Sequence, residues 1–226
     1  MIALLIMLFL TFGYTHDLWL EKVGDRIVLY YGHIKPKEGE EGLISYKAEN
    51  VLKAMCFNKE AKRVEVQIER VYPLSFPANC FAYYVLFSTG YWTKTIKGTK
   101  NLPKDKAEGP LESWLSYEGV KRLESWTETF KRPLTEDLEI VPLEDPFSVS
   151  LNSKISLKVY YRGKPVKGAV VAYQGRVVGS TDEEGNINVR IKEKGLQRIS
   201  ASIKEKSDGL KADYTVISTN LIFEVR

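Results

Sequence analysis

The sequence predicts a mainly β protein, in which an N-terminal β domain with a short helical insertion precedes a C-terminal seven-stranded β-sandwich. Three patterns support this fold class. Residues 17–32 form two apolar-rich runs around a glycine turn, residues 62–72 alternate polar and apolar side chains, and the chain after residue 146 consists of short apolar runs separated by turn residues. A period of two is typical of half-buried strands, and frequent turns are typical of sandwiches.

Residues 1–12 carry no charged side chain and are almost all large and apolar. Such a run is too short to span a bilayer and is typical of the apolar core of a secretory signal peptide. We therefore expect residues 1–15 to be a signal peptide, with an uncleaved N-terminal anchor as the alternative. Small residues allow cleavage after Gly13 or after Thr15. The mature protein would then be periplasmic or otherwise extracytoplasmic, and not an integral membrane protein.

Gly24 and Asp25 form a two-residue turn signal between the first two apolar runs, which predicts a β-hairpin. With these residues as the loop, positions that face each other across the hairpin have numbers that sum to 49. His16 then faces His33, and these are the only two histidines of the chain. Directly opposed Cβ atoms lie about 5 Å apart, which is close enough for two imidazoles to bind one ion. A shift of one residue in register would put the histidines on opposite faces.

The paired histidines predict a metal site beside the mature N-terminus. Cleavage after Gly13 would leave His16 third in the chain, where the terminal amine, two amides and the imidazole form a planar four-nitrogen set. Cleavage after Thr15 would leave His16 first, where its own amine and imidazole form a chelate. Nitrogen sets of this kind suit Cu(II) and Ni(II). Tyr31, on the same hairpin face, and Asp17 are candidate axial or neighbouring groups, and an exposed histidine at a frayed end is the alternative.

The two cysteines, Cys56 and Cys80, are an even number in a chain that is predicted to be exported, which predicts a disulfide. A pair of thiolate metal ligands is the alternative, although the spacing matches no zinc motif. Cys56 precedes the alternating run at 62–72, and Cys80 begins a second apolar run at 80–92. A bridge would therefore join these two predicted strands.

The rest of the N-terminal domain, 16–142, contains two further segments. Residues 91–110 are rich in Lys, Thr and Gly, and we expect a long ordered loop whose lysines are solvated rather than an anion or membrane site. Residues 111–130 place Leu and Trp side chains at near-helical spacing, which predicts one or two short helices.

Prolines at 142 and 146 indicate a stiff connector before the C-terminal β-sandwich, 146–226. Turn residues at intervals of eight to twelve positions divide this segment into seven expected strands. They are 148–151, 154–161, 166–173, 176–180, 186–191, 196–204 and 214–225.

The formal net charge of +4 is spread thinly, with Lys and Arg alternating with Glu, so nucleic acid is not an expected partner. With only two histidines, both assigned to the metal site, no Ser or Cys triad can be built. The acidic residues show no motif that pairs an acid with a base. We therefore expect no catalytic residues and no enzyme activity.

Two resemblances extend these expectations. The segments VYYRGKPVKGAVVAY, STDEEGNINVRI and GLQRISAS, within 150–205, resemble the carboxypeptidase-regulatory and transthyretin-like sandwich modules. The whole chain is similar to an exported family whose members carry a leader, H-x-x-W-L-E, Y-G-H and a Y-W-T-K-T-x-x-G-x-K-N segment. Here these motifs are residues 16–21, 31–33 and 91–101. The second resemblance implies a periplasmic role in nickel or cobalt uptake, with a membrane transporter component as partner.

The expected function is therefore an extracytoplasmic metal-binding protein that presents Ni(II) or Co(II) to a membrane uptake system. One alternative is a copper-binding protein with a terminal-histidine site. The other is a non-metal envelope interaction protein that binds protein or glycan and whose histidines have no role.

Overall fold

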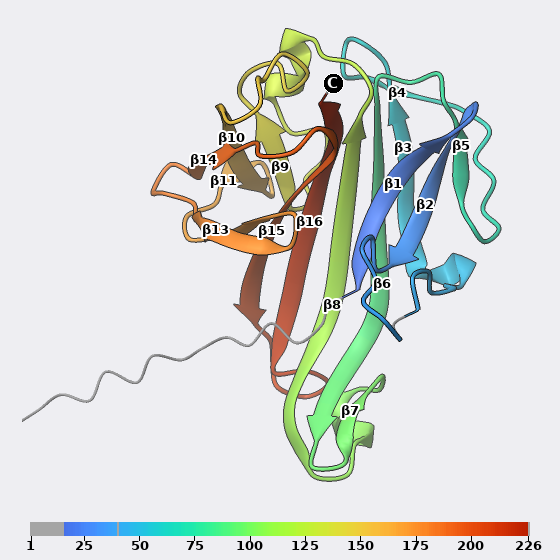
Figure 1. The fold of residues 1–226 in the computed structure, drawn as a ribbon. Coiled ribbons are helices and arrows are strands. Elements are labelled where there is room, and N and C mark those ends of the chain that lie inside the picture. Colours follow the sequence, from blue (N-terminus) through green and yellow to red (C-terminus); the bar gives the residue numbers. More distant parts are fainter. Residues whose placement is uncertain (1–15, 40, 226) are drawn as a thin grey trace, which may run out of the picture.

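The structure is a computed structural model that describes residues 16–39 and 41–225. The predicted signal peptide, 1–15, lies outside the described residues. In the described part the chain is mainly β, as predicted, and its helices are short 3-10 turns at Ala48–Asn50 (η1), Lys104–Lys106 (η2) and Glu128–Lys131 (η3). Figure 1 shows the strands arranged as three layers, with the longest strands in the middle.

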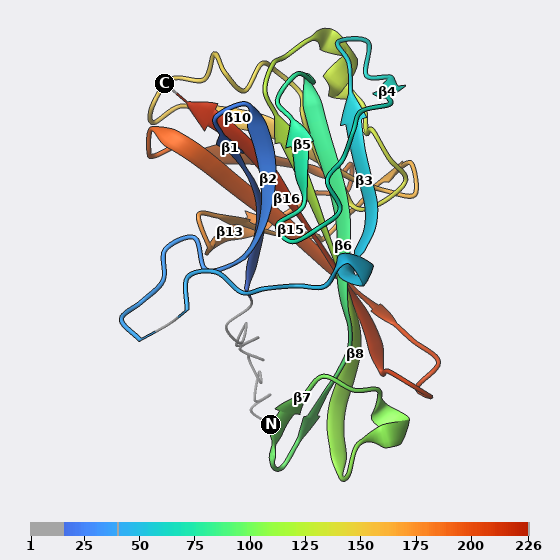
Figure 2. The ribbon, with the colours of Figure 1, turned by 90° about the vertical axis from the view of Figure 1, so that its right-hand side faces the viewer.

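The central layer is a nine-stranded sheet with the order β13-β12-β15-β16-β8-β6-β3-β4, in which β7 also pairs with β6. Its strands are β3 (Val51–Phe57), β4 (Arg63–Val64), β6 (Ala82–Thr95), β7 (Gly98–Lys100), β8 (Pro110–Leu123), β12 (Val170–Tyr173), β13 (Arg176–Ser180), β15 (Gly195–Lys206) and β16 (Tyr214–Val225). The far ends of β6 and β8, with β7 and η2, extend well beyond the other two layers (Figure 2). We call this extension the arm.

Two smaller sheets cover the opposite faces of the central sheet. The first has the order β1-β2-β5, and the second has the order β11-β10-β14 with β9 also paired to β10. Their strands are β1 (Asp17–Val23), β2 (Arg26–Gly32), β5 (Ser75–Pro77), β9 (Glu139–Pro142), β10 (Lys154–Tyr161), β11 (Lys164–Pro165) and β14 (Asn186–Arg190).

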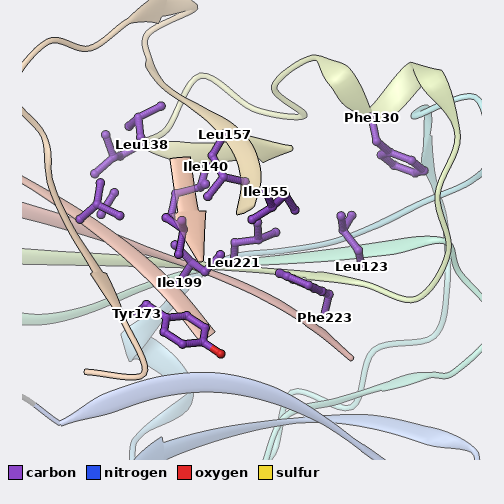
Figure 3. Close-up of a cluster of buried hydrophobic side chains, with 14 of the residues drawn as sticks. Leu123, Phe130, Leu138, Ile140, Ile155, Leu157, Tyr173, Ile199, Leu221 and Phe223 are labelled. Carbon is purple, nitrogen blue, oxygen red and sulfur yellow. The ribbon is translucent and has the colours of Figure 1, made fainter. Parts of the chain in front are cut away.

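Each interface between layers holds its own buried apolar cluster. Alternation along β10 places Ile155 and Leu157 against Leu221 and Phe223 of β16, in the cluster drawn in Figure 3. On the other face, the second cluster packs the apolar side chains of the β1–β2 hairpin against β6 and β8. The central sheet is therefore apolar on both faces over most of its area.

The nine-stranded sheet is continuous across the expected connector at 142–146. Strand β16 pairs in parallel with β8, from Tyr214 opposite Trp114 to Ile222 opposite Arg122. Strand β9, which precedes the connector, pairs with β10, which follows it. The N-terminal and C-terminal segments therefore share both a sheet and a core.

Two buried cations connect the layers. Lys121 and Glu139 are almost fully buried and lie 2.7 Å apart, and the same carboxylate accepts bonds from the backbone of Leu134 and Thr135. Arg122 donates to Leu20 O of the hairpin at 3.1 Å. Buried charges persist only when paired and hydrogen-bonded, and these two side chains meet that condition.

The predicted helices over 111–130 are wrong. Pro110–Leu123 is strand β8, and only Glu128–Lys131 forms a single 3-10 turn. Strand β8 is hydrogen-bonded to β6 on one side and β16 on the other, and these distant pairings override the local spacing of Leu and Trp.

Four other expected elements differ from the structure. Of residues 166–173, only Val170–Tyr173, strand β12, is a strand. Residues 148–151 form no strand, and of 62–72 only Arg63–Val64 is a strand. The expected loop at 91–110 includes the end of β6, the strand β7 and the turn η2. By contrast, the expected strands 154–161, 176–180 and 214–225 coincide with β10, β13 and β16.

The predicted disulfide is confirmed. Cys56 of β3 and Cys80, just before β6, are bonded with their Cα atoms 6.0 Å apart. Because both sulfur atoms are bonded to each other, these cysteines do not form the alternative, a pair of thiolate metal ligands. Bonded cysteines are typical of proteins outside the reducing cytoplasm, so the bridge fits an extracytoplasmic location.

Candidate metal centre

The predicted hairpin register is confirmed. Strands β1 and β2 pair from Asp17 opposite Gly32 to Val23 opposite Arg26, so that paired numbers sum to 49. His16 and His33 lie just beyond the last pair, and their ring centroids are 5.0 Å apart with the planes at 68°. Both side chains are half-buried. The structure thus brings the two histidines together at one end of the hairpin.

The loop that follows β2 holds His33 in place. The backbone of His33 donates to Gly42 O at 2.7 Å, and Ile44 N donates to Tyr31 O at 2.8 Å. Gly32, between Tyr31 and His33, has φ +145°, and a Cβ there would overlap the carbonyl of Gly42. Only glycine lets the loop approach so closely. The Y-G-H motif therefore has a structural reason for its central residue.

Tyr31 contacts His16 directly. Its hydroxyl lies 3.1 Å from Nδ1 of His16, and the two rings meet edge to face at 5.2 Å. Burial, and then the charge of Glu118, raise the pKa of Tyr31 above its ordinary value, so the phenol keeps its proton at neutral pH. The prediction that Tyr31 neighbours the site agrees with this contact.

Asp17 is engaged by two groups from elsewhere in the chain. One oxygen forms an ion pair with Arg198 of β15, and the other accepts a bond from Ile34 N at 3.3 Å. Asp17 therefore connects the end of β1 to the loop after His33 and to the C-terminal part of the chain. Its carboxylate holds the two histidine-bearing segments in position.

Glu118 of β8 lies beneath the hairpin end. Asn220 Nδ2 donates to Glu118 Oε1 at 3.2 Å, and the backbone of Leu18 also donates to this carboxyl. Burial, and then the negative charge of Asp17, raise the pKa of Glu118 to about 8, while Asn220 and Arg198 oppose the rise. Glu118 is thus mostly protonated at neutral pH.

The site keeps His16 in the neutral form. Burial lowers the pKa of His16 below 6.5, the nearby His33 lowers it further, and Asp17 opposes the change. A metal-binding imidazole must be unprotonated, so this environment prepares His16 for ligation at neutral pH.

Among the described side chains, His16 and His33 are the two candidate metal donors that lie together. Between residues 16 and 225, with Glu40 left out, no three His, Cys, Asp or Glu side chains are placed to hold one ion. A complete donor set would therefore need water, Tyr31 or groups of the mature N-terminus. Nδ1 of His16, the atom nearest the Tyr31 hydroxyl, is the nitrogen that a terminal amine–imidazole chelate would use.

Sequence reasoning missed Arg198, Glu118 and Asn220. They reach the site from β15, β8 and β16, and only the sheet pairing brings them beneath the hairpin. No local pattern in their own segments distinguishes them.

Within the described chain, none of the helices is long and apolar enough to cross a membrane.

Comparison with known proteins gives one match. The sequence pattern of a family described as a domain of unknown function, DUF4198, matches residues 26–205. The matched range includes Tyr31 and His33 but starts after His16 and Asp17. Neither the curated proteins nor the solved structures gave a significant match.

Proposed function

The chain belongs to the DUF4198 family, and we propose that it is an extracytoplasmic protein that binds Ni(II) or Co(II) through His16 and His33. The observation that supports this most strongly is the pairing of the only two histidines of the chain, with ring centroids 5.0 Å apart. The family description assigns no activity, so the proposal depends on the site itself.

The chemistry of the site favours a borderline transition metal. Imidazole nitrogen suits Ni(II), Co(II), Cu(II) and Zn(II), whereas Mg²⁺ and Ca²⁺ prefer oxygen sets. His16 is held neutral, and Tyr31 and Asp17 hold its surroundings in place. Cleavage of residues 1–15 would add the amine of His16 itself, while cleavage after Gly13 would add an amine and two amides. Intact mass of the exported protein distinguishes the two.

The proposed role is to carry the metal ion as cargo to a membrane uptake component. The disulfide between Cys56 and Cys80 supports a location outside the cytoplasm, and a site with few protein donors suits an ion that must be released again. The transporter component is the partner implied by the resemblance of residues 16–21 and 31–33.

Calorimetric titration of the mature protein with Ni(II), Co(II) and Cu(II) tests the proposal. We expect one ion per chain, and an affinity that falls by about tenfold or more, or about 1.4 kcal/mol, in His16→Ala and in His33→Ala. Glu38→Ala is the matched control, because this exposed carboxylate lies in the loop after His33 but outside the site. Equal affinity in all four proteins contradicts the proposal.

A terminal-histidine copper site is the second candidate. The position of His16 directly after one predicted cleavage site favours it. Copper would replace the hydrogen bond between Nδ1 and the Tyr31 hydroxyl, which would leave the phenol beside the ion. Divalent copper is also bound more tightly than nickel by most nitrogen sets. Oxygen consumption by the copper-loaded protein with ascorbate separates a carrier, which is inactive, from an oxidase.

A further inference from the structure

Three aromatic side chains form a row across the central sheet where it continues into the arm. Trp92 of β6 is paired with Trp114 of β8, and Trp114 is paired with Tyr214 of β16. Directly paired residues project from the same face of a sheet. We call these three residues the aromatic row. Each is partly exposed, and none belongs to either buried apolar cluster.

The aromatic row lies on the same face as the histidine pair. Trp114 is four residues from Glu118 on β8, and Tyr214 is six residues from Asn220 on β16, so alternation puts all four on one face. Glu118 and Asn220 lie beneath the hairpin end that carries His16. Figures 1 and 2 show that β6, β8 and β16 continue past this end of β1 and β2.

The opposite face of the same strands is closed at one pair of residues. Thr93 and Ser113 are fully buried there, although both are polar. Thr93 donates to Leu102 O at 2.8 Å, and Ser113 donates to Asp213 at 2.8 Å. The segment after β7 and Asp213 thus cover this part of the opposite face, whereas Trp92, Trp114 and Tyr214 are partly exposed on theirs. This is the reverse of what packing alone would favour, because burial stabilises aromatic rings more than hydroxyls.

The surroundings of the aromatic row are small or polar. On the side toward the histidines, the next positions are Gly90, Ser116 and Val216, whose side chains are shorter than the aromatic rings. On the other side lie Lys94 and Glu112, which are also paired across the strands.

Three contacts hold the aromatic row and the side chains beside it in place. Lys204 Nζ lies 3.7 Å from the centroid of the Tyr214 ring and 2.8 Å from Glu112 Oε1. Trp92 Nε1 donates to Thr89 Oγ1 at 2.8 Å, which holds that indole ring in one orientation. The aromatic row is therefore pre-formed. Beside it lie Lys94, Lys204 and Lys206, which is paired with Tyr214, and one carboxylate, Glu112.

We propose that the aromatic row is a binding surface for a neutral glycan chain. The C–H faces of pyranose rings pack on indole and phenol rings, and the sugar hydroxyls exchange hydrogen bonds with the serine, lysine and glutamate side chains around them. The basic side chains beside the row are Lys94, Lys206 and Lys204, the last paired with Glu112, and they are fewer than the clusters of Lys and Arg that bind nucleic acid or an anionic membrane. A single row three strands wide fits an extended chain better than a broad protein interface.

Tryptophan fluorescence and calorimetric titration with cellohexaose, chitohexaose and maltohexaose test this proposal. We expect at least one of these glycans to bind. Its affinity should fall by about tenfold or more in Trp92→Ala and in Trp114→Ala. Tyr91→Ala is the matched control, because Tyr91 is adjacent in sequence but projects from the opposite face, and it should leave the affinity unchanged. Thermal unfolding of each variant checks the fold.

A measurement on the wild-type protein gives an independent readout. The bound glycan should protect Trp92 and Trp114 from oxidation by N-bromosuccinimide, and mass spectrometry reports each site separately. The proposal is overturned if none of the three glycans binds, if Tyr91→Ala weakens binding as much as the tryptophan variants, or if only heparin or phosphatidylglycerol vesicles bind.

The glycan surface does not depend on the proposed metal function. Glycan binding should persist in the double variant His16→Ala, His33→Ala, whereas metal binding should persist in Trp114→Ala. Either proposal can therefore fail while the other stands.

Discussion

Replacing Glu118 by glutamine tests how the chain supports the histidine pair. The folded protein holds the pKa of Glu118 at about 8, against 4.5 for the ordinary carboxyl, because the group is buried beside Asp17. Between these two values the folded state binds a proton that the unfolded state has lost. The free energy of unfolding of the wild type therefore falls by about 1.4 kcal/mol for each pH unit in this window.

The size of this change in the free energy of unfolding follows from the pH range between the two pKa values. The stabilisation by protonated Glu118 is fully present below pH 4.5 and is lost as the pH rises through about 8. The upper bound is about 4 to 5 kcal/mol, and partial access of solvent to Glu118 reduces it. Relative to Glu118→Gln, which carries no titrating proton, we expect the wild type to lose about 2 kcal/mol across this range.

Urea unfolding of both proteins at a series of pH values measures this difference. Ser116→Ala is the control, because it changes the same face of β8 without removing a carboxyl, and it should keep the wild-type profile. Parallel pH profiles for the wild type and Glu118→Gln would refute the reasoning, since the carboxyl would then titrate alike in the folded and unfolded chains.

Three further predictions concern stability and pH. Replacing Cys56 and Cys80 by serine should lower the free energy of unfolding by about 3 kcal/mol, because the disulfide closes a loop with a sequence separation of 24. Urea unfolding measures this loss of stability, and a loss near zero would contradict the prediction. Lys121→Met should cost about 3 kcal/mol in the same assay because it leaves Glu139 buried without its cation. Also changing Glu139 to glutamine, which removes the charge but keeps an acceptor for the backbone of Leu134 and Thr135, should recover part of the loss, and an equal loss in both variants would refute this account. In the metal-free protein the pKa of His16 should lie below 6.5, because burial and the nearby His33 lower it; an NMR titration in which the His16 ring gains its proton above pH 6.5 would contradict this.

The sequence predicts those parts of the structure that local patterns determine. The hairpin register follows from the turn at Gly24-Asp25, and the strands 154–161 and 214–225 follow from alternation between clear turns. The juxtaposition of His16 and His33 is a direct consequence of the hairpin register.

Long-range pairing explains what the sequence did not predict. Strand β8 is covered on both faces near its end, where Lys121 and Arg122 are buried with partners, so its sequence shows no simple alternation. The aromatic row likewise exists only because β6, β8 and β16 lie side by side. Arg198, from β15, reaches Asp17 across 181 positions of sequence.

X-ray absorption spectroscopy of the nickel-loaded mature protein tests the central claim most directly, because it counts the imidazoles that ligate the ion. The account predicts two imidazoles in the wild type and one in His16→Ala or in His33→Ala, with Glu38→Ala like the wild type. A nickel ion with only oxygen neighbours in the wild type, or a spectrum that neither histidine variant changes, would contradict it.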